Sequence, residues 1–262
     1  MPQGYPAREV DYDSGRMIPI GDDDSDRRTI PFVTWLLIAV NVFVFVALQG
    51  MGSNERFTMA FATVPAEILS GRDIAQPIPV RDSSGQSVGT LELFPTPIPV
   101  YLTLITAMFM HGGFAHIFGN MLYLWIFGDN LEDALGHLRY FVFYLATGVL
   151  AGLAHVAVTA ALGANPLIPS LGASGAISGV LGGYIVLFPR RRVRVLWLYS
   201  VMSVPALAAI GLWFVFQLVS GAGMLGGSTG GVAYGAHIGG FVAGVVLVKL
   251  FGGDRRPALG RA

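Results

Sequence analysis

The sequence predicts an all-α, polytopic membrane protein built as a bundle of six membrane-spanning helices. Of its 262 residues, 53% are apolar and only 12% are charged, against about 25% charged in a typical soluble domain. Mean hydropathy is +0.63, and charged residues are missing in long blocks. Because a spanning helix needs about 20 apolar residues, the lengths of these blocks predict the number of spans.

The overall charge and the cysteine count exclude several classes of function. Sixteen Lys and Arg balance sixteen Asp and Glu, so the chain has no net positive charge with which to bind nucleic acid. The sequence contains no cysteine, which excludes a disulfide framework, a thiol nucleophile and cysteine-ligated metal sites. We expect no cofactor and no metal ion.

The first two uncharged blocks each predict one span. Residues 32–48 carry no charge and could cross a bilayer once, although this block is slightly short. Residues 93–128 carry no Asp, Glu, Lys or Arg but contain His111 and His116. We place the second span at the C-terminal end of this block.

The other two blocks, residues 140–189 and 195–248, are each too long for a single span. Stretches rich in turn-forming residues interrupt them at 163–169 and 220–231, and such composition is typical of loops. Each block is therefore predicted to form two helices. The six predicted spans are residues 32–49, 110–128, 140–161, 172–188, 195–218 and 233–250.

The distribution of Lys and Arg supports this count, because cytoplasmic loops hold an excess of both residues. With the N-terminus inside, six spans also place the C-terminus inside. Only Arg56, Arg72 and Arg81 of the 16 Lys and Arg then fall outside. These three share one long outer loop, about residues 49–100, where the rule has least weight.

The segments outside the spans are predicted as two tails and one loop. Residues 1–30 are polar and lack the features of a secretory signal, so we expect a flexible cytoplasmic tail. Residues 31–251 form the membrane domain, including the long outer loop, and residues 252–262 form a short cytoplasmic tail. This compact form leads us to expect a bacterial plasma membrane.

Few polar residues fall inside the predicted spans, and each is a functional candidate because a polar group in lipid is energetically unfavourable. They are His111, His116, Asn120, His155, Ser174, Ser178 and His237. Counted from the cytoplasmic helix end at 1.5 Å per residue, Ser174 lies at about 21 Å and His237 at about 20 Å. His116 lies at about 18 Å, and Asn120 follows it by about one turn. These four side chains can line one cavity that opens to the outer side.

Their residue types indicate nucleophilic catalysis. A serine hydroxyl beside a histidine is a potential nucleophile with its general base. An asparagine and a second histidine can donate hydrogen bonds to an oxyanion. Ser174 also stands in the sequence Gly172-Ala173-Ser174-Gly175, a loop that enters a helix, where free backbone amides point at a developing anion.

Small residues repeat at four-residue spacing on the two helices that carry the serine and the histidine. The first stripe is Gly175, Gly179 and Gly183, and the second is Ala236, Gly240 and Gly244. Small residues allow helices to pack closely in lipid. We therefore expect these faces to bring Ser174 and His237 to hydrogen-bond distance.

Three motifs in this order resemble the rhomboid family of intramembrane serine proteases. They are His111-Gly-Gly-Phe-Ala-His116-Ile-Phe-Gly-Asn120, Gly172-Ala173-Ser174-Gly175 and Ala236-His237-Ile-Gly-Gly240. The resemblance covers about residues 31–251, including the number of spans. A Gly-x-Ser-Gly motif alone is a weak signal, but the three motifs on three helices are specific.

The resemblance implies roles for individual residues. Ser174 corresponds to the family's nucleophile and His237 to its base, with no carboxylate partner required. His116 and Asn120 correspond to oxyanion-hole residues that act with backbone amides near Ser174. Substrates are then transmembrane proteins cut in or near their membrane segments. Residues that can support this site are His111, Gly172, Ala173, Gly175 and Ser178.

The chain departs from the family's pattern in two places. The first outer loop lacks the Trp-Arg pair found in some members, and one position near the nucleophile differs. Many members carry Tyr or Phe four residues after the nucleophile, where the ring packs against the catalytic histidine. This chain has Ser178 there. Another group must then steady His237, and an aromatic side chain from a neighbouring helix is the expected one.

Several of these residues also have a structural interpretation. His116 and Asn120 can act as polar contacts between helices. His155 has no matched polar partner on another predicted span, so it is best explained as a structural residue. Ser178 can hydrogen-bond to its own helix. The arginine cluster at residues 190–194 is best explained as an orientation signal, with anionic-lipid binding as the alternative.

Other classes of function fit less well. A metalloprotease is excluded because His-Glu-x-x-His is absent, and the aspartates Asp129 and Asp133 lie at a cytoplasmic edge rather than as a buried pair. A transporter would be expected to show an inverted repeat, which we do not find. The main alternative is a catalytically inactive rhomboid-like factor that binds membrane proteins, although such a factor would be expected to lack Ser174 or His237.

Overall fold

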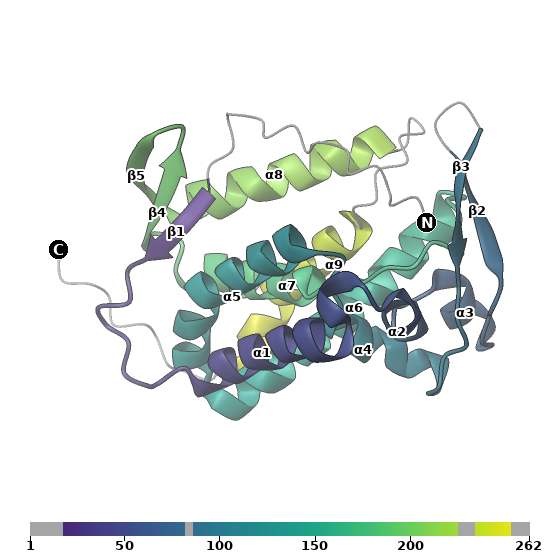
Figure 1. Cartoon of the computed structure of the whole chain (residues 1–262). Coiled ribbons are helices and arrows are strands. Elements are labelled where there is room, and N and C mark those ends of the chain that lie inside the picture. Colours follow the sequence, from purple (N-terminus) through teal and green to yellow (C-terminus); the bar gives the residue numbers. More distant parts are fainter. Residues whose placement is uncertain (1–17, 82–85, 225–233, 253–262) are drawn as a thin grey trace.

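The computed structural model describes residues 18–81, 86–224 and 234–252, and this part of the chain is mostly helical. Long helices run roughly side by side, with a small sheet at each end of the bundle (Figure 1). The long helices are α1 (Phe32–Phe43, continued by a π-helical turn at Val44–Leu48), α5 (Phe114–Leu135), α6 (His137–Ala161), α7 (Ser174–Leu187), α8 (Ala206–Met224) and α9 (Tyr234–Phe251).

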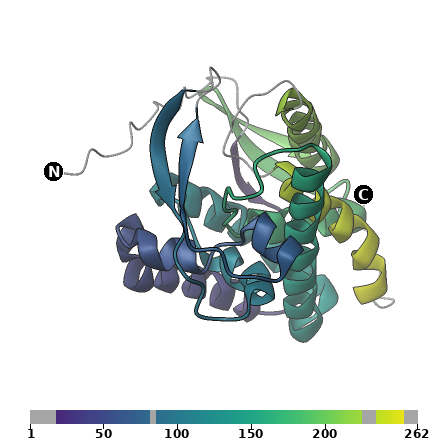
Figure 2. The same ribbon diagram turned by 90° about the vertical axis from the view of Figure 1, so that its right-hand side faces the viewer.

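The predicted outer loop at residues 49–100 contains short regular elements. A 3-10 turn at Gly50–Gly52 leads into two short helices, and a β-hairpin follows, whose two strands lie side by side in Figure 2. A further short helix leads to α5. These elements are α2 (Glu55–Ala60), α3 (Pro65–Ser70), β2 (Pro77–Arg81), β3 (Ser87–Glu92), the 3-10 turns Val100–Leu102 and Ala107–Phe109, and α4 (Thr103–Thr106).

The structure agrees with the predicted class, a helical membrane protein. Among the described residues, α6 and α9 are each long and apolar enough to cross a membrane. The bent pair Val100–Phe109 and Phe114–Leu135, which meet at 82°, forms a third candidate. Shorter apolar helices are Phe32–Leu48, Ser174–Leu187 and Ala206–Gly221. The count of six spans therefore stays a prediction.

The predicted fifth span at residues 195–218 is wrong in its first half. The chain there forms a β-hairpin, β4 (Arg192–Trp197) and β5 (Ser200–Pro205), and α8 begins only at Ala206. β-Branched residues such as Val193, Val195 and Val201 favour a strand. The absence of charge made this segment look like part of a longer span.

The prediction of a flexible tail through residue 30 is also wrong in part. β1 (Ile18–Asp22) pairs antiparallel with β4, which gives a three-stranded sheet in the order β1-β4-β5. The chain after β1 is held by acidic side chains of α5: Arg27 binds Asp129, and the Thr29 hydroxyl donates to Asp133 at 2.6 Å. Residues 1–17 lie outside the described part of the chain.

A buried carboxylate joins α5 to the start of α1. Glu132 is fully buried and accepts the backbone N–H groups of Val33 at 3.0 Å and Thr34 at 2.8 Å. The Thr34 hydroxyl and the His137 ring also bind this carboxylate. The first N–H groups of a helix have no partner within the helix, so Glu132 supplies the missing acceptor for α1.

Helices α7 and α9 pack backbone against backbone. A Cβ atom added at Gly240 would lie 2.1 Å from the Gly175 carbonyl oxygen, and one at Gly244 would lie 2.0 Å from the Gly179 carbonyl oxygen. The predicted small-residue stripes thus meet at these positions. At Gly183 the neighbours are side chains rather than backbone. A Cβ atom there would lie 3.3 Å from Val248 of α9, and it would also meet Phe143 and Leu131.

Candidate active site

The close packing of α7 and α9 places Ser174 beside His237. The Ser174 Oγ and His237 Nε2 atoms are 2.8 Å apart, within hydrogen-bond distance. Ser174 is the first residue of α7, and His237 lies near the start of α9. Both residues are half-buried. A serine hydroxyl at this distance from an imidazole can act as a nucleophile with its base.

The turn before Ser174 depends on a glycine. Gly172 has φ +123°, a conformation that side-chain-bearing residues rarely adopt. Its N–H donates to the Ala107 carbonyl at 2.8 Å, which ties the turn to the segment before α5. Ala173 is fully buried. The first amides of α7 follow this turn and have no acceptor within their own helix, so they are available to an anion beside Ser174.

His237 has a second hydrogen-bond partner that was not among the sequence-predicted site residues. The Gln217 Oε1 atom lies 2.8 Å from His237 Nδ1, and Gln217, on α8, is only 6% exposed. A carbonyl oxygen can only accept, so this contact places the ring proton on Nδ1. Nε2 is then free to accept the Ser174 hydroxyl proton, the tautomer that a general base needs.

Two aromatic rings lie near His237, and one of them, Trp213, comes from the neighbouring helix α8, as expected. The rings of Trp213 and Tyr234 have centroids 6.2 Å and 6.4 Å from the His237 ring. Trp213 lies one turn before Gln217 on α8. Gln217 could have been identified as a candidate from the sequence, because it is a polar amide in the otherwise apolar stretch 206–219. Its partner could not be identified before α8 was placed against α9.

His116 lies on the other side of the Ser174 turn. A Cβ atom at Gly172 would be 2.8 Å from both Cε1 and Nε2 of His116, so the imidazole packs directly on this turn. Nδ1 of His116 accepts the Gly112 N–H at 3.3 Å. His111 is fully buried and meets the His116 ring edge-on, with centroids 5.2 Å apart.

The other polar candidates and Gly175 make contacts within their own helix or with a neighbouring helix. The Asn120 amide donates to the His116 carbonyl at 3.0 Å, within α5. The Ser178 hydroxyl donates to the Ser174 carbonyl at 2.7 Å, within α7. Gly175 lies against Ala151 of α6. His155, also on α6, has its Cα atom 3.3 Å from the position of a Cβ at Gly235.

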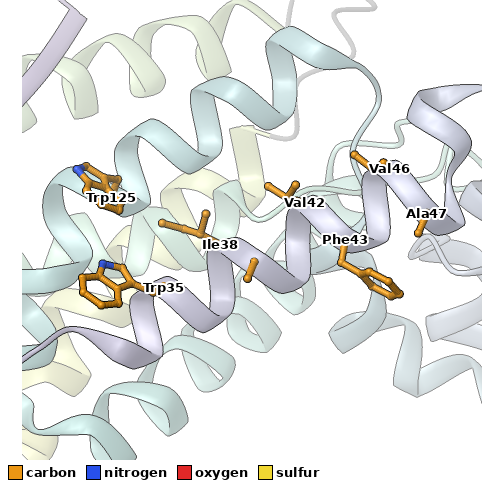
Figure 3. A pocket seen from close by; sticks show the side chains of 8 residues that line it. Trp35, Ile38, Val42, Phe43, Val46, Ala47 and Trp125 are labelled. Carbon is orange, nitrogen blue, oxygen red and sulfur yellow. The ribbon is translucent and has the colours of Figure 1, made fainter.

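A metal centre or an apolar groove would be a different kind of site from this arrangement of side chains. No group of three or more metal-ligating side chains occurs within the described ranges. A groove of about 530 Å³ runs between α1 and α5 (Figure 3). Its lining is entirely apolar and contains none of the predicted site residues, so it offers no group for chemistry. The lining residues are Trp35, Ile38, Ala39, Val42, Phe43, Val46, Ala47 and Trp125.

The chain is similar to proteins that are named rhomboid. "Rhomboid protein 1, mitochondrial" of Saccharomyces cerevisiae is 35% identical over 148 residues, which are 55% of this chain and 40% of that protein. "Rhomboid protease GluP" of Bacillus subtilis is 25% identical over 212 residues, 80% of this chain and 35% of that protein. "Rhomboid-like protein 11, chloroplastic" of Arabidopsis thaliana is 31% identical over 163 residues, 58% of this chain and 53% of that protein. This chain spans about a third to a half of the length of these relatives.

These relatives come from different organelles and organisms. Their names include mitochondrial and chloroplastic proteins, so they support a membrane protein and give no support to the expected bacterial plasma membrane. The profile of the Rhomboid domain matches residues 99–253, which is more than half of the chain and includes Asn120, Ser174 and His237. The chain belongs to the rhomboid family, whose members are typically intramembrane serine proteases.

Proposed function

We propose that this protein is an intramembrane serine protease that hydrolyses peptide bonds in or near the transmembrane segments of other membrane proteins. Ser174 is the nucleophile and His237 is the general base. The observation that carries the proposal is the 2.8 Å contact between Ser174 Oγ and His237 Nε2. Membership of the rhomboid family supports the same reaction.

The reaction proceeds in two halves. Ser174 Oγ attacks the scissile carbonyl carbon while its proton passes to His237 Nε2. The tetrahedral intermediate collapses, the C–N bond breaks, and His237 protonates the leaving amine. Water then attacks the acyl-enzyme with His237 again as base, which releases the new carboxyl end and restores the Ser174 hydroxyl.

The negative charge on the carbonyl oxygen needs donors beside Ser174. The free amides at the start of α7 are the first of these. His116 supports this role because its Nε2 edge packs on the Gly172 turn. Asn120 uses its amide group in a bond to the His116 carbonyl, and its second N–H leaves a donor for the oxyanion.

Gln217 has a positioning role in this proposal. Its carbonyl holds the Nδ1 proton of His237 at 2.8 Å, so the base keeps one tautomer and one ring orientation. In serine proteases with a catalytic triad this role belongs to a carboxylate. Here a neutral amide on a neighbouring helix occupies the same place relative to the imidazole.

We further propose that six helices span the membrane with both chain termini inside: α1, α5, α6, α7, α8 and α9. The site then lies below the outer surface, and water reaches it from the outer side. A substrate helix hides its carbonyl groups in internal hydrogen bonds. Segments that unwind easily are therefore the expected substrates.

The test is cleavage of a tagged single-span substrate in liposomes by wild type, Ser174→Ala and His237→Ala, with fluorophosphonate labelling of each. Ser178→Ala is the matched control, because Ser178 lies one turn further along α7 and binds a backbone carbonyl. We expect cleavage and labelling by wild type and Ser178→Ala only. A folded wild type that is neither labelled nor active on several helix-destabilised substrates would contradict the proposal and favour an inactive binding factor.

A further inference from the structure

The β4–β5 hairpin ends in an apolar tip that no described part of the protein covers. Trp197, Leu198 and Tyr199 at the turn are 43%, 52% and 101% exposed. Val201 and Met202, on β5, are also exposed. Tryptophan and tyrosine concentrate where a membrane meets water, since one end of each ring system is apolar and the other is polar.

The base of the hairpin is firmly packed, so the exposed tip is not the end of a loose loop. Val193 and Val195 are buried in the main hydrophobic core. Their strand is paired on one side with β1 and on the other with β5. Because side chains alternate along a strand, Arg192 and Arg194 point away from this core face and are exposed.

The hairpin is placed where it can meet the edge of a bilayer. It stands at the end of α8 and projects crosswise to the helices (Figure 1). α8 lies at the periphery of the bundle (Figures 1 and 2). Its outward side chains are apolar and exposed: Leu207, Leu212, Val215 and Val219. The tip thus continues the apolar outer surface of a helix that we propose spans the membrane.

The charges at the base favour an anionic partner. Arg190, Arg192 and Arg194 are exposed, and the segment 189–252 contains no Asp or Glu. None of these three arginines forms an ion pair within the described residues, unlike the neighbouring Arg191, which binds Asp26 at 2.7 Å. The acidic residues that adjoin β4 come from the segment after β1, where Asp26 binds Arg191 and Asp24 binds Arg27. Basic residues beside an apolar segment bind the phosphates of anionic lipids.

We propose that the β4–β5 hairpin is a membrane-interface anchor, with the tip Trp197–Tyr199 inserted beside the cytoplasmic end of α8 and the arginines bound to anionic lipid phosphates. This inference is independent of catalysis and does not require Ser174 to be a nucleophile. It gives the arginine cluster a binding function in addition to its effect on orientation. It also gives one end of the peripheral helix α8 an attachment to the lipid.

The chain contains no cysteine, so one introduced cysteine gives a unique probe site. Tyr199→Cys and Val201→Cys are each labelled with the environment-sensitive fluorophore NBD in nanodiscs of phosphatidylglycerol or phosphatidylcholine. Asp24→Cys is the control, because Asp24 lies in the polar segment that follows β1 and is exposed. Both hairpin sites are highly exposed, so the substitutions should leave the fold unchanged.

In phosphatidylglycerol discs we expect the probes at both hairpin positions, 199 and 201, to show a blue-shifted emission, quenching by lipids spin-labelled near the headgroup, and loss of quenching by iodide. The Asp24 probe should remain fully quenched by iodide. Replacing Arg192 and Arg194 together by glutamine should return the tip signal in phosphatidylglycerol to its value in phosphatidylcholine.

Three outcomes would overturn the proposal. Equal iodide quenching at Tyr199→Cys and Asp24→Cys would show that the tip lies in water. A lipid-quenching signal that is the same for both headgroups and unchanged by the arginine substitutions would show that the arginines do not bind anionic lipid. A protected tip whose signal grows with the number of protein copies per disc would show that a second chain covers it.

Discussion

At the scale of single residues, the most informative position is Gln217. We expect Gln217→Met, which keeps the length of the side chain but removes the acceptor, to lower kcat/KM about tenfold, in line with the loss of one hydrogen bond of about 1.5 kcal/mol. Gln217→Glu restores an acceptor to His237 Nδ1 and should recover most of this activity. The measurement is cleavage of a single-span substrate across a range of pH.

The pH dependence separates positioning from packing. A carboxylate at position 217 favours the protonated imidazole, so the acidic limb of the rate profile for Gln217→Glu should move to higher pH. If the side chain at position 217 does not contact the His237 ring, the profile of Gln217→Glu should stay in place. Gln49→Met is the matched control: Gln49 is fully buried and donates to the His111 carbonyl at 2.9 Å, so its loss should affect stability without moving the profile.

At the scale of elements, the contact between α7 and α9 determines whether the serine and the histidine meet. We expect Gly240→Ala to destabilise the protein by about 1–3 kcal/mol, the usual range for overpacking. It should also reduce fluorophosphonate labelling strongly. The reason is steric, because the added Cβ would lie 2.1 Å from the Gly175 carbonyl oxygen, on the residue after Ser174.

The control for this substitution is Gly211→Ala. Gly211 lies in α8, and a Cβ there would meet nothing within 4 Å. Because alanine has a higher helix propensity than glycine, this substitution should stabilise the helix without a steric clash. Thermal unfolding in detergent and fluorophosphonate labelling are measured for both variants. Equal labelling by Gly240→Ala and wild type would show that the two helices tolerate a wider separation than their backbone contact indicates.

A second prediction at this scale concerns the start of α1. Removing the carboxylate in Glu132→Ala leaves two N–H groups and two side chains without their acceptor. We expect a loss of about 3 kcal/mol or more in the free energy of unfolding, since hydrogen bonds to charged groups contribute about 1.5–3 kcal/mol each. Glu132→Gln should lose less, and Glu55→Ala, at an exposed position in α2, should be close to neutral. Denaturation in micelles measures all three.

At the scale of the whole molecule, the class of fold and the central pair of site residues could be predicted from the sequence. Lipid requires helices that satisfy their own backbone groups, so uncharged blocks predict helices directly. Depth counting placed Ser174 and His237 at one level, and the structure brings their side chains together. Their catalytic roles stay a prediction.

Other features depend on contacts between distant segments and could not be predicted. Apolar content alone does not distinguish a strand from a helix over a short run, so β4 and β5 were missed. β1 forms by pairing with the edge of β4, which lies far away in the sequence. In the same way, the polar segment after β1 is ordered by Asp129 and Asp133, about a hundred residues later in the chain.

The attachment of β1 to the bundle predicts how stability depends on pH. Burial raises the pKa of Asp22 above its usual value of 3.8, although Tyr184, Asn130 and Arg191 favour its charged form. The folded protein therefore binds this proton more tightly than the unfolded chain does. The resulting stabilisation is complete below pH 3.8 and is lost as the pH rises through the raised pKa.

Asp22→Asn removes the carboxylate charge but keeps a side-chain oxygen. In the wild type, Asn130 Nδ2 donates to the Asp22 carboxylate at 2.8 Å, and the amide oxygen of the variant can still accept this hydrogen bond. We expect the variant to melt at a higher temperature than wild type at neutral pH, with a difference that shrinks as the pH falls toward 4. The neighbouring Asp23 should show the opposite dependence of stability on pH. Its pKa is lowered because Ser25 donates to its carboxylate, so Asp23→Asn should lose stability at neutral pH and approach wild type in acid. If both variants shifted in the same direction at every pH, the effect would come from packing rather than from burial of the Asp22 charge.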